Sequence, residues 1–552
     1  MAIAATRPHE LAYSELAAFS KTAPRLLLDR AGERPGASCV HDRGRWWSNE
    51  QLVAMVGGMQ HRLRSAGVRP GDVVSMQLPN WLEAAVTVHA VWGLGAVLNP
   101  ITPIYRGGEL TAIFADCRPR AVVVPDSFRG TEYSTMARDS LSAAGVTADL
   151  VVLNAGGYDE HAFASADPVE ARCGPDDIGV LMYTSGTTGS PKGVLHSHRT
   201  LLYEAGSIAA RFGNRPERVF MPSPLTHITG LVFGVLMPLL TGGDLVLMDV
   251  WDAAAAAGLI EAHGCTASVG ATPFLSGLLD AYRARRSRCA LDWFVCGGAD
   301  VPPSLIRESR EVMKTVTVRA YGLTEMPTVT CGAPEDEVFV ASETDGRPVG
   351  PSLVRLATEC GAVGELEVSG PELFLGYADP ADNSAAFTPD GWFRTGDLAS
   401  IGPDGAVTIV GRSKDIIVRG GENISAKEVE DLLIADPAVS DVSVVGVPDP
   451  VLGERACAVV VPTAEPVELA HLVTRLEQAR IAKQKFPEFV LLVDELPRTP
   501  SGKIQKFVLR EYAARRLAST KAARDEPDRE SRAGVDPAQC QVPLNNAEDL
   551  AT

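Results

Sequence analysis

The feature that most limits the fold of this chain is a long alternation of short β-branched runs with Ala- and Leu-rich helical stretches. The alternation covers residues 1 to about 410 and includes the runs "AVVVP", "VVLN", "DLVLMDV" and "LDWFVCGGA". Strands that alternate with helices predict stacked α/β layers. The chain has 552 residues, which is too long for one hydrophobic core, so we expect two or more domains.

The pattern changes in the last third of the sequence. From "GELEVSGPELFLGY" to "AVTIV", strands are separated by Gly, Pro and Asp, which predicts a β portion of barrel-like character. A shorter unit follows "GRSKD" and alternates strands with helices at 426–435 and 467–483. We therefore expect a large domain at 1–411, a small α+β domain at 412–516, and a polar, disordered tail at 517–552.

Composition excludes several classes of protein. Apolar residues make up 45% and charged residues 22% of the chain, which is typical of a soluble globular protein. A net charge of −18 argues against nucleic acid as a partner. The ten cysteines are scattered without a CxxC pair, which favours reduced thiols over a zinc site. No signal peptide opens the chain and no apolar run is long enough to span a bilayer, so the sequence predicts a cytoplasmic protein without a membrane span. The oligomeric state stays open, and a homo-oligomer is compatible with the sequence.

The segment from Tyr183 to Val194, "YTSGTTGSPKGV", combines glycines, hydroxyls and one lysine in a single turn. Its glycines allow backbone N–H groups to point into one concavity, and its hydroxyls and lysine add donors and positive charge. The segment therefore predicts a phosphate-binding loop, although it is not a Walker loop because Lys192 follows Pro191. The alternative is a polar turn after the buried strand "IGVLMYT".

Two further segments carry polar groups that a nucleotide could use. In "YGLTEMP", Tyr321 could stack on a purine, Thr324 could bond a phosphate, and Glu325 could hold Mg²⁺ among phosphate oxygens. In "WFRTGDLA", Asp397 could accept both hydroxyls of a ribose. The alternatives are a strand end with its turn for the first segment, and a routine Gly-Asp turn for the second.

Two basic segments belong to the predicted small domain. "GRSKDIIVRGGENIS" places Arg412 and Lys414 where the large domain gives way to the small one, either as a charged hinge or as a solvated linker. "PRTPSGKIQK" places Lys503 after a Pro/Ser/Gly turn, from which it could extend into a cleft. Considered alone, Lys503 is better explained as a surface lysine.

Taken together and in this order, the segments resemble the adenylate-forming superfamily of acyl-CoA synthetases, peptide-synthetase adenylation domains and luciferases. The resemblance covers about residues 25–510 and five motifs. It implies a large N-terminal domain, a small mobile C-terminal domain and an active site between them. It also implies the cofactors ATP, Mg²⁺ and coenzyme A: a carboxylate attacks the α-phosphate of ATP, and a thiol then displaces AMP from the acyl-adenylate.

The resemblance implies a role for each motif residue. The β- and γ-phosphates would be held by Thr184, Ser185, Thr187, Thr188 and Lys192. The adenine side would be lined by Gly298, Ala299, Tyr321 and Gly322. Thr324 would touch the α-phosphate, Glu325 would bind Mg²⁺, and Asp397 with Arg412 would grip the ribose. Lys503 would stabilise the charge-rich transition state, Lys414 would be the hinge, and Gly420 with Gly421 would lie near the pantetheine tunnel.

Two positions depart from the family pattern. Thr226 stands before His227 in "PLTHITG", where the family usually has an aromatic residue. His227 would remain as a gate at the mouth of the acyl pocket, with an altered neighbour. Lys506 stands in "GKIQK" where the family commonly has Arg, which keeps the charge but cannot reproduce a bidentate contact.

Small and apolar residues dominate the acyl pocket that the resemblance implies. Its lining would be His227, Leu231, Gly270, Ala271, Gly297, Met326 and Thr330. Because no Asp, Lys or Arg is among them, we expect a hydrophobic carboxylate, either aliphatic, alicyclic or bulky and terpenoid-like. Arg285 and Arg286 of "RARRSR" could bind the phosphates of CoA, and a solvated helix end is the alternative.

These residues lead to three hypotheses of function. The first is an ATP-dependent acid–CoA ligase that runs both half-reactions. The second is an enzyme of the same fold that is specialised for one half-reaction or that loads an acyl carrier protein. The third is a nucleotide-binding regulatory protein without catalysis, against which the presence of both Glu325 and Lys503 argues.

Overall fold

The chain forms two compact units. The computed structural model describes residues 19–153, 169–184, 191–215, 217–298, 301–357, 363–412, 415–419, 422–449, 452–479, 481–498 and 503–525. The larger unit contains the chain up to Arg355 together with Glu367–Arg394 and Pro403–Val407. The smaller unit contains Leu356–Leu366, Thr395–Gly402 and the chain from Thr408 onward. The units thus differ from the predicted ranges, because Leu356–Leu366, Thr395–Gly402 and the four residues from Thr408 to Gly411 group with the smaller unit.

One large sheet in the larger unit has parallel strands at its centre and antiparallel strands at its two ends. Its strand order is β17 (Arg347–Pro348), β16 (Met326–Cys331), β15 (Val316–Leu323), β14 (Trp293–Gly297), β13 (Ala267–Gly270), β11 (Arg218–Met221), β12 (Asp244–Leu247), β1 (Ser38–Asp42), β2 (Arg45–Ser48). The carboxyl ends of the parallel strands therefore meet at one edge, which is where open α/β sheets bind ligands.

A second sheet carries the predicted phosphate loop. Its strand order is β20 (Gly376–Tyr377), β10 (Lys192–Ser197), β9 (Ile178–Thr184), β4 (Val97–Pro100), β3 (Val73–Met76), β5 (Ala121–Pro125), β8 (Asp149–Leu153). The strands from β9 to β8 are parallel, whereas β10 pairs antiparallel with both β9 and β20. The run "AVVVP" of β5 is buried throughout, as expected for a parallel strand covered on both faces.

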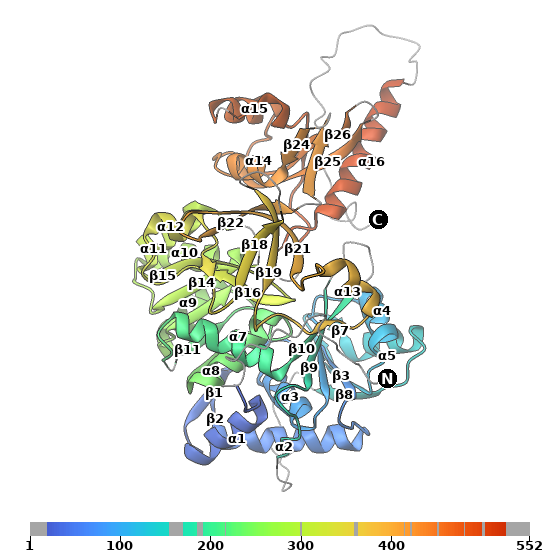
Figure 1. Cartoon of the computed structure of the whole chain (residues 1–552), viewed down its shortest axis with the longest axis vertical. Helices are drawn as coiled ribbons and strands as arrows, with labels where there is room; N and C mark the ends of the chain where they lie inside the picture. The colour runs from blue at the N-terminus through green and yellow to red at the C-terminus, as the bar shows by residue number, and fades with distance from the viewer. Residues whose placement is uncertain are drawn as a thin grey trace. The chain divides into compact units, whose positions relative to one another are not determined.

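Helices cover both sheets of the larger unit (Figure 1). They are α1 (Ala23–Glu33), α2 (Asn49–Ser65), α3 (Leu82–Gly93), α4 (Gly107–Cys117), α5 (Tyr133–Ala143), α7 (His198–Arg211), α8 (Met237–Thr241), α9 (Ala253–His263), α10 (Thr272–Arg285), α11 (Pro303–Met313), α12 (Val338–Glu343) and α13 (Pro380–Ala386). A π-helix, η2 (Gly230–Leu236), precedes α8, and a short hairpin pairs β6 (Ser127–Phe128) with β7 (Thr131–Glu132).

Local sequence fixes where several of these helices begin. Helix α2 starts with a capping box, in which the Ser48 hydroxyl accepts from the Gln51 N–H and the Gln51 side chain accepts from the Ser48 N–H. The Ser197 hydroxyl caps α7 by accepting from the Thr200 N–H at 3.2 Å. Because Ser197 is also the last residue of β10, the cap turns the chain directly from the strand behind the phosphate loop into α7.

The β portion and the smaller unit complete the fold. One sheet has the order β18 (Leu353–Ala357), β19 (Gly364–Ser369), β21 (Phe393–Ile401), β22 (Val407–Arg412), and another has the order β24 (Glu422–Ser425), β23 (Ile416–Arg419), β26 (Gly453–Pro462), β25 (Val439–Asp449), with β27 (Phe489–Leu492) paired to β26. The helices of the smaller unit are α14 (Ala426–Leu433), α15 (Leu469–Gln478), the 3₁₀ turn η4 (Lys483–Lys485) and α16 (Lys506–Asp525).

Each unit has hydrophobic clusters of its own. The largest cluster of the larger unit includes Trp92, Phe220, Phe294 and Leu231. In the smaller unit, α14 and α15 pack on one side of the β25–β26 pair and the start of α16 packs through Leu509 and Tyr512. The sequence prediction of a mixed α/β multidomain protein, with a large N-terminal and a small C-terminal part, is confirmed. Helix α16 runs to Asp525, past the predicted start of the tail at 517.

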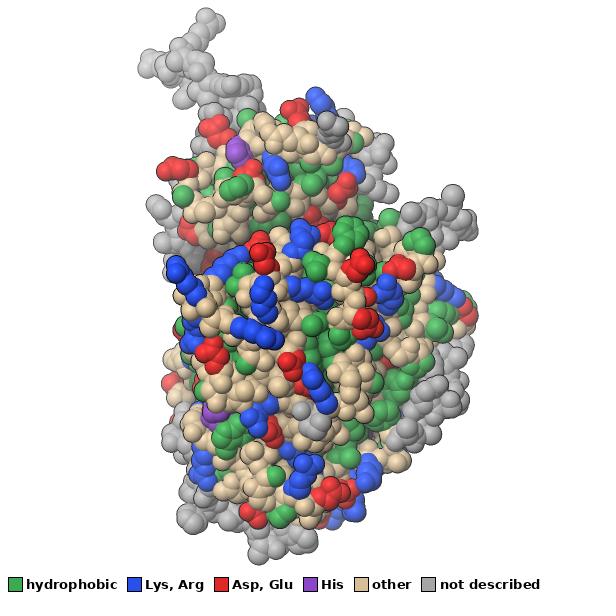
Figure 2. Space-filling view, turned by 90° about the vertical axis from the view of Figure 1, so that its left-hand side faces the viewer, with side chains coloured by type: hydrophobic (Ala, Val, Ile, Leu, Met, Phe, Trp, Pro, Cys, Tyr) green, Lys and Arg blue, Asp and Glu red, His purple; other side chains and the backbone are tan. Residues whose placement is uncertain are grey.

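The surface mixes charges of both signs. Figure 2 shows basic and acidic side chains interspersed on the face in view, with no extended area of one sign. Ion pairs such as Arg355 with Asp390 at 2.6 Å and Arg215 with Asp292 at 2.9 Å are consistent with this arrangement. None of the helices in the described part of the chain is long and apolar enough to cross a bilayer.

Candidate active site

The strands that flank the predicted phosphate loop bring its two ends together. Thr184 ends β9, Lys192 begins β10, and the two residues are cross-strand partners. The hydroxyl residues Ser185, Thr187 and Thr188 lie outside the described residues. The antiparallel pair therefore places one hydroxyl and one ammonium group at the mouth of the same hairpin.

The segment "YGLTEMP" is a hairpin whose tip is the pair Thr324 and Glu325. Strands β15 and β16 pair on either side of it through Leu323 and Met326. A Cβ at Gly322 would lie 1.9 Å from the Pro327 carbonyl oxygen. Only glycine therefore fits at this position, where the register of the two strands also shifts.

Three contacts hold the tip of this hairpin. His196 on β10 donates through Nε2 to the Thr324 carbonyl at 2.8 Å. The Phe374 N–H donates to the Glu325 carbonyl at 2.8 Å, and the Tyr377 hydroxyl donates to the Glu325 carboxylate at 2.7 Å. Burial first, and then the Glu325 carboxylate, raises the pKa of Tyr377. The phenol therefore stays protonated and keeps Glu325 oriented.

Lys192 lies in the same network as Glu325. Its Nζ is 2.8 Å from an Asp382 carboxylate oxygen and 4.9 Å from the centre of the Tyr377 ring. Tyr377 thus contacts the lysine with its ring and Glu325 with its hydroxyl. The two sequence motifs, which are more than a hundred residues apart in the chain, meet at one tyrosine.

The residues predicted to line the adenine and acyl pockets end parallel strands of the large sheet. Gly270 ends β13 and pairs with Cys296 of β14, while Gly297 ends β14 and pairs with Ala320 of β15. A Cβ at Gly297 would lie 2.5 Å from the Ala320 carbonyl oxygen, so glycine is required there. Gly298 follows with φ +80°. Ala299 lies outside the described residues.

Four of the remaining predicted acyl residues are buried. Leu231 on η2 and Met326 on β16 are fully enclosed, and Ala271 precedes α10 as its N-cap. Thr330 is also buried, but its hydroxyl donates to the Asp345 carbonyl at 2.7 Å. That hydroxyl therefore already has an acceptor within the protein.

His227 lies in the turn before η2. Its Nδ1 accepts from the Thr229 N–H at 3.3 Å, so the neutral ring carries its proton on Nε2. Burial lowers the pKa of His227 to about 4. The imidazole is therefore uncharged at neutral pH, which suits a place beside an apolar acyl chain.

Asp397 and Arg412 form a pair within the smaller unit. Asp397 is on β21 after Gly396, which has φ +72°, and Arg412 ends β22. The Arg412 Nε is 2.8 Å from an Asp397 carboxylate oxygen, and the side chain of Asp397 is 5% exposed. The arginine thus fixes the carboxylate that was predicted to accept the ribose hydroxyls.

The other predicted residues of the smaller unit are only partly described. Lys503 precedes Ile504, which forms a β-bridge with Arg498. Lys414, Gly420 and Gly421 lie outside the described residues. In the larger unit, Arg285 in the last turn of α10 forms an ion pair with Glu261 at 2.8 Å and donates to the Ala254 carbonyl. Arg286 ends the helix with φ 53°.

Sequence reasoning missed three residues of the site: His196, Tyr377 and Asp382. Each acts through a contact that spans at least 50 residues of sequence, with Thr324, Glu325 and Lys192 as the respective partners. The one available signal was the Gly-Tyr pair at the end of "PELFLGY", which was assigned only to a strand pattern.

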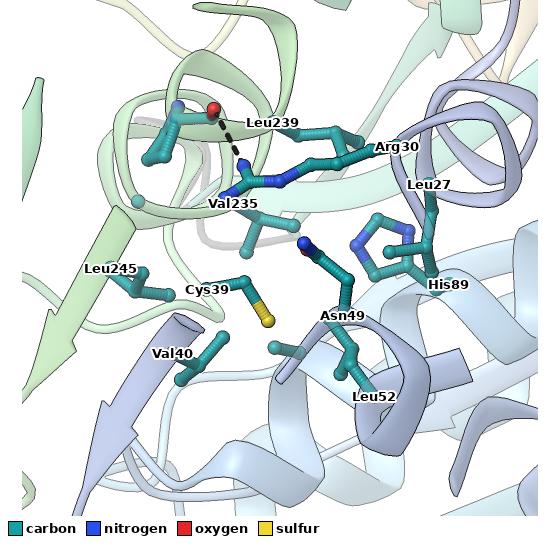
Figure 3. Close-up of a pocket in the computed structure, with 13 residues that line it drawn as sticks. Leu27, Arg30, Cys39, Val40, Asn49, Leu52, His89, Val235, Leu239 and Leu245 are labelled. Carbon is teal, nitrogen blue, oxygen red and sulfur yellow. Dashed lines mark hydrogen bonds between the residues drawn. The ribbon is translucent and has the colours of Figure 1, made fainter. Parts of the chain in front are cut away.

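Figure 3 shows a separate pocket of the larger unit, bounded by α1, β1, α2, α3 and η2. Leu27, Val40, Leu52 and Val235 form apolar walls, and Arg30 donates to the Pro238 carbonyl at 3.2 Å. None of the residues predicted for the active site lines this pocket. We therefore assign it no part in the chemistry of the site.

The chemistry that these residues can perform follows from their types. Lys192 and Glu325 contact one tyrosine, and each has a threonine beside it, Thr184 across the strand pair and Thr324 in the chain. This set suits a polyphosphate with its Mg²⁺, since Mg²⁺ is commonly bound by one or two carboxylates together with phosphate oxygens. No group of three or more potential metal ligands occurs among the described residues. The fold and the residues at its strand ends therefore define a nucleotide-using α/β enzyme.

Comparison with known proteins identifies the class. The AMP-binding enzyme family matches residues 27–378, and the AMP-binding enzyme C-terminal domain matches residues 428–503. The chain belongs to the AMP-binding enzyme family. Within that family it is an AMP-forming acyl-CoA ligase.

Relatives and solved structures agree over most of the chain. A medium-chain fatty-acid–CoA ligase of Escherichia coli is 35% identical over 505 residues, which are 87% of this chain and 88% of the relative. A salicylyl-CoA synthase of Streptomyces is 33% identical over 500 residues, covering 86% and 90%. The ATP-bound structure of MatB from Rhodopseudomonas palustris has a TM-score of 0.80 and 29% identity, and the match covers 90% of this chain and 99% of that one.

Proposed function

We propose that the protein activates a hydrophobic carboxylate, aliphatic, alicyclic or bulky and terpenoid-like, and transfers the acyl group to the thiol of coenzyme A. The observation that carries this proposal is the lining of the predicted acyl pocket. Leu231 and Met326 are buried, Gly270 and Gly297 add no side chain at the strand ends, and His227 is neutral. Such walls offer no charged group to a polar or amino substituent.

The relatives support this range of acids without choosing among them. By their names they act on a medium-chain fatty acid, on salicylate, and, in Rhodococcus jostii, on a propanoate that carries a methylated dioxo-octahydroindenyl ring system. The ring-bearing propanoate is the example closest to a bulky alicyclic acid. The Rhodococcus ligase is 33% identical over 519 residues.

The proposed roles in the first half-reaction follow from charge. Both the attacking carboxylate and the triphosphate are anionic, so their approach must be screened. We assign Lys192 and Thr184 to the outer phosphates, Thr324 to the α-phosphate and Glu325 to Mg²⁺. Asp397 and Arg412 hold the ribose, and Lys503 supplies positive charge near the α-phosphate.

The decisive experiment measures ATP- and CoA-dependent thioester formation over a panel of linear, alicyclic, polycyclic and aromatic acids and amino acids. Linear, alicyclic or polycyclic apolar acids should give the highest kcat/KM. A preference for benzoate or for a polar amino acid would contradict the proposed substrate class.

A second assay separates the full ligase from an enzyme specialised for one half-reaction. Pyrophosphate release with the acid but without CoA reports adenylation, and thioester formation from synthetic acyl-AMP reports the second step. Comparable rates in both assays support the complete ligase, whereas a rate in only one supports the specialised enzyme. An acyl carrier protein in place of CoA tests the remaining alternative acceptor.

A further inference from the structure

Lys192 and Asp382 form an ion pair at one end of the predicted phosphate loop. Lys192 begins β10 at the end of the phosphate loop, and Asp382 lies in the first turn of α13. Their charged atoms are 2.8 Å apart, and the two side chains are 26% and 32% exposed. The pair is therefore tight but remains open to a competing anion.

The position of Asp382 is fixed by its neighbours. The Asn383 side chain accepts from the Tyr377 N–H at 2.8 Å and donates to the Tyr377 carbonyl at 3.2 Å. Tyr377 itself is on β20, which pairs with β10 through Val194. Helix α13 is thus tied to the strand that carries Lys192, so Asp382 is held beside the lysine by the fold.

Tyr377 contacts both Lys192 and the proposed magnesium ligand Glu325. Its ring lies beneath the lysine ammonium at 4.9 Å, and its hydroxyl holds Glu325. The lysine is thereby kept on the side of the proposed magnesium ligand. An anion that replaces Asp382 on Lys192 therefore meets an ammonium group that lies over the same tyrosine whose hydroxyl holds the Glu325 carboxylate.

We propose that Asp382 is the resting counter-ion of Lys192, which the outer phosphates of ATP displace on binding and which returns to the lysine when pyrophosphate leaves. Asp382 is a positioning residue in this scheme, since it contacts the lysine and not the substrate. It keeps the lysine ordered in the nucleotide-free protein and competes with pyrophosphate during release. The inference rests on the proposed function of Lys192.

The substitution Asp382→Asn tests the competition. Removing the competing charge should tighten binding of ATP and of pyrophosphate by about two- to fivefold, because a partly exposed ion pair typically changes an equilibrium by about that factor. Binding of AMP should not change, because AMP lacks the outer phosphates. Isothermal titration calorimetry on the full chain, with ATP, pyrophosphate and AMP in turn, measures all three without relying on turnover.

Two further variants make the result decisive. Asp379→Asn is a matched control, because it removes the same charge at the N-cap of the same helix, where asparagine also caps well. It should leave all three affinities as in the wild type. In a Lys192→Ala background, Asp382→Asn should no longer tighten ATP binding, because the two substitutions act through one contact.

The possible failures are distinguishable. If the wild-type protein binds ATP but Asp382→Asn matches Asp379→Asn for every ligand, the competition is wrong and the proposed function stands. Weaker ATP binding by Asp382→Asn would also contradict the proposed competition, because it would show that Asp382 favours nucleotide binding. If the wild-type protein binds neither ATP nor pyrophosphate, the proposed function itself fails.

Discussion

At the scale of single residues, the site depends on side chains whose charge is controlled by what lies around them. Burial keeps His227 neutral, and Tyr377 stays protonated beside Glu325. Two other buried acids, Glu204 on α7 and Glu372 before β20, each have one carboxyl oxygen without a hydrogen-bond partner among the described residues. The Glu204 carboxylate accepts from the Thr328 N–H, and Glu372 accepts from the Ser352 hydroxyl at 2.7 Å.

Glu372 should make the stability of the protein depend on pH. Burial, as the main cause, raises the pKa of Glu372 to about 7 from the ordinary value of 4.5. The folded protein therefore holds this proton between about pH 4.5 and 7 while the unfolded chain loses it, so stability falls as pH rises through this window. The loss is complete above about pH 7.

The variant Glu372→Gln should remove that loss. At pH 8 it should unfold in urea at a higher midpoint than the wild type, and the difference should vanish below pH 4.5. Urea titrations at both pH values, followed by circular dichroism, measure it. A variant that is less stable than the wild type at pH 8 would show that Glu372 is ionised and paired in the folded state.

Lys192 gives a prediction about activity at the same scale. The variant Lys192→Ala should lower ATP-dependent adenylation roughly a hundredfold, since removing one preorganised donor costs a few kcal/mol. Thioester formation from preformed acyl-AMP should change little, because the outer phosphates have already left. Pyrophosphate exchange measures adenylation, and a thioester assay measures the second step. Lys21→Ala is the control for loss of a surface lysine. Equal losses of rate in both steps would contradict the assignment of Lys192 to the outer phosphates.

At the scale of elements, hairpins and strand ends decide where the site residues are placed. The β9–β10 pair joins the two ends of the phosphate loop, and the β15–β16 pair presents Thr324 and Glu325 at its tip. Where the backbones of two paired segments come very close, only a residue without a side chain fits. Gly322 is the clearest case, because of the Pro327 carbonyl oxygen beside it.

The variant Gly322→Ala should therefore distort the β15–β16 hairpin. The added methyl group should cost about 1–3 kcal/mol of stability, as overpacking does, and should weaken ATP binding because Glu325 moves. Thermal unfolding and ATP calorimetry measure the two effects. Gly36→Ala is the matched control, since a Cβ there meets no atom within 4 Å; an unperturbed Gly322→Ala would show that the hairpin tolerates a side chain.

At the scale of the whole molecule, the proposed chemistry divides between residues of the two units. Lys192, Thr324 and Glu325 belong to the larger unit, and Asp397, Arg412 and Lys503 to the smaller one. The family resemblance assigns Lys503 to adenylation alone. We therefore expect Lys503, which belongs to the smaller unit, to be needed for adenylation but not for thioester formation.

The variant Lys503→Ala should test this division. Adenylation, measured as pyrophosphate release with acid and ATP, should fall at least a hundredfold, since the variant loses the charge near the α-phosphate. Thioester formation from synthetic acyl-AMP and CoA should stay within a few-fold of the wild type. A comparable loss in both assays would show that Lys503 serves the second step as well.

The sequence by itself determined the class of the protein and supplied most of the proposed site residues. The spacing of apolar residues along the sequence indicates strands and helices, so the α/β layers could be predicted. A lysine in a glycine- and hydroxyl-rich turn is typical of phosphate binding, so the phosphate loop and the order of the motifs could be predicted as well. Strand β9 lies where the run "IGVLMYT" indicated a buried strand, and Thr324 and Glu325 follow the end of a strand, as one interpretation of "YGLTEMP" expected.

Only the tertiary structure decided what holds these motifs in place. The contacts of Glu325 with Tyr377, of Thr324 with His196 and of Lys192 with Asp382 join segments that no local pattern connects. Contacts between distant segments likewise group Leu356–Leu366 and Thr395–Gly402 with the smaller unit, although they precede the predicted boundary. The physical reason is the same in each case: a local pattern fixes the type of element, whereas partners across a sheet are chosen by the packing of the whole chain.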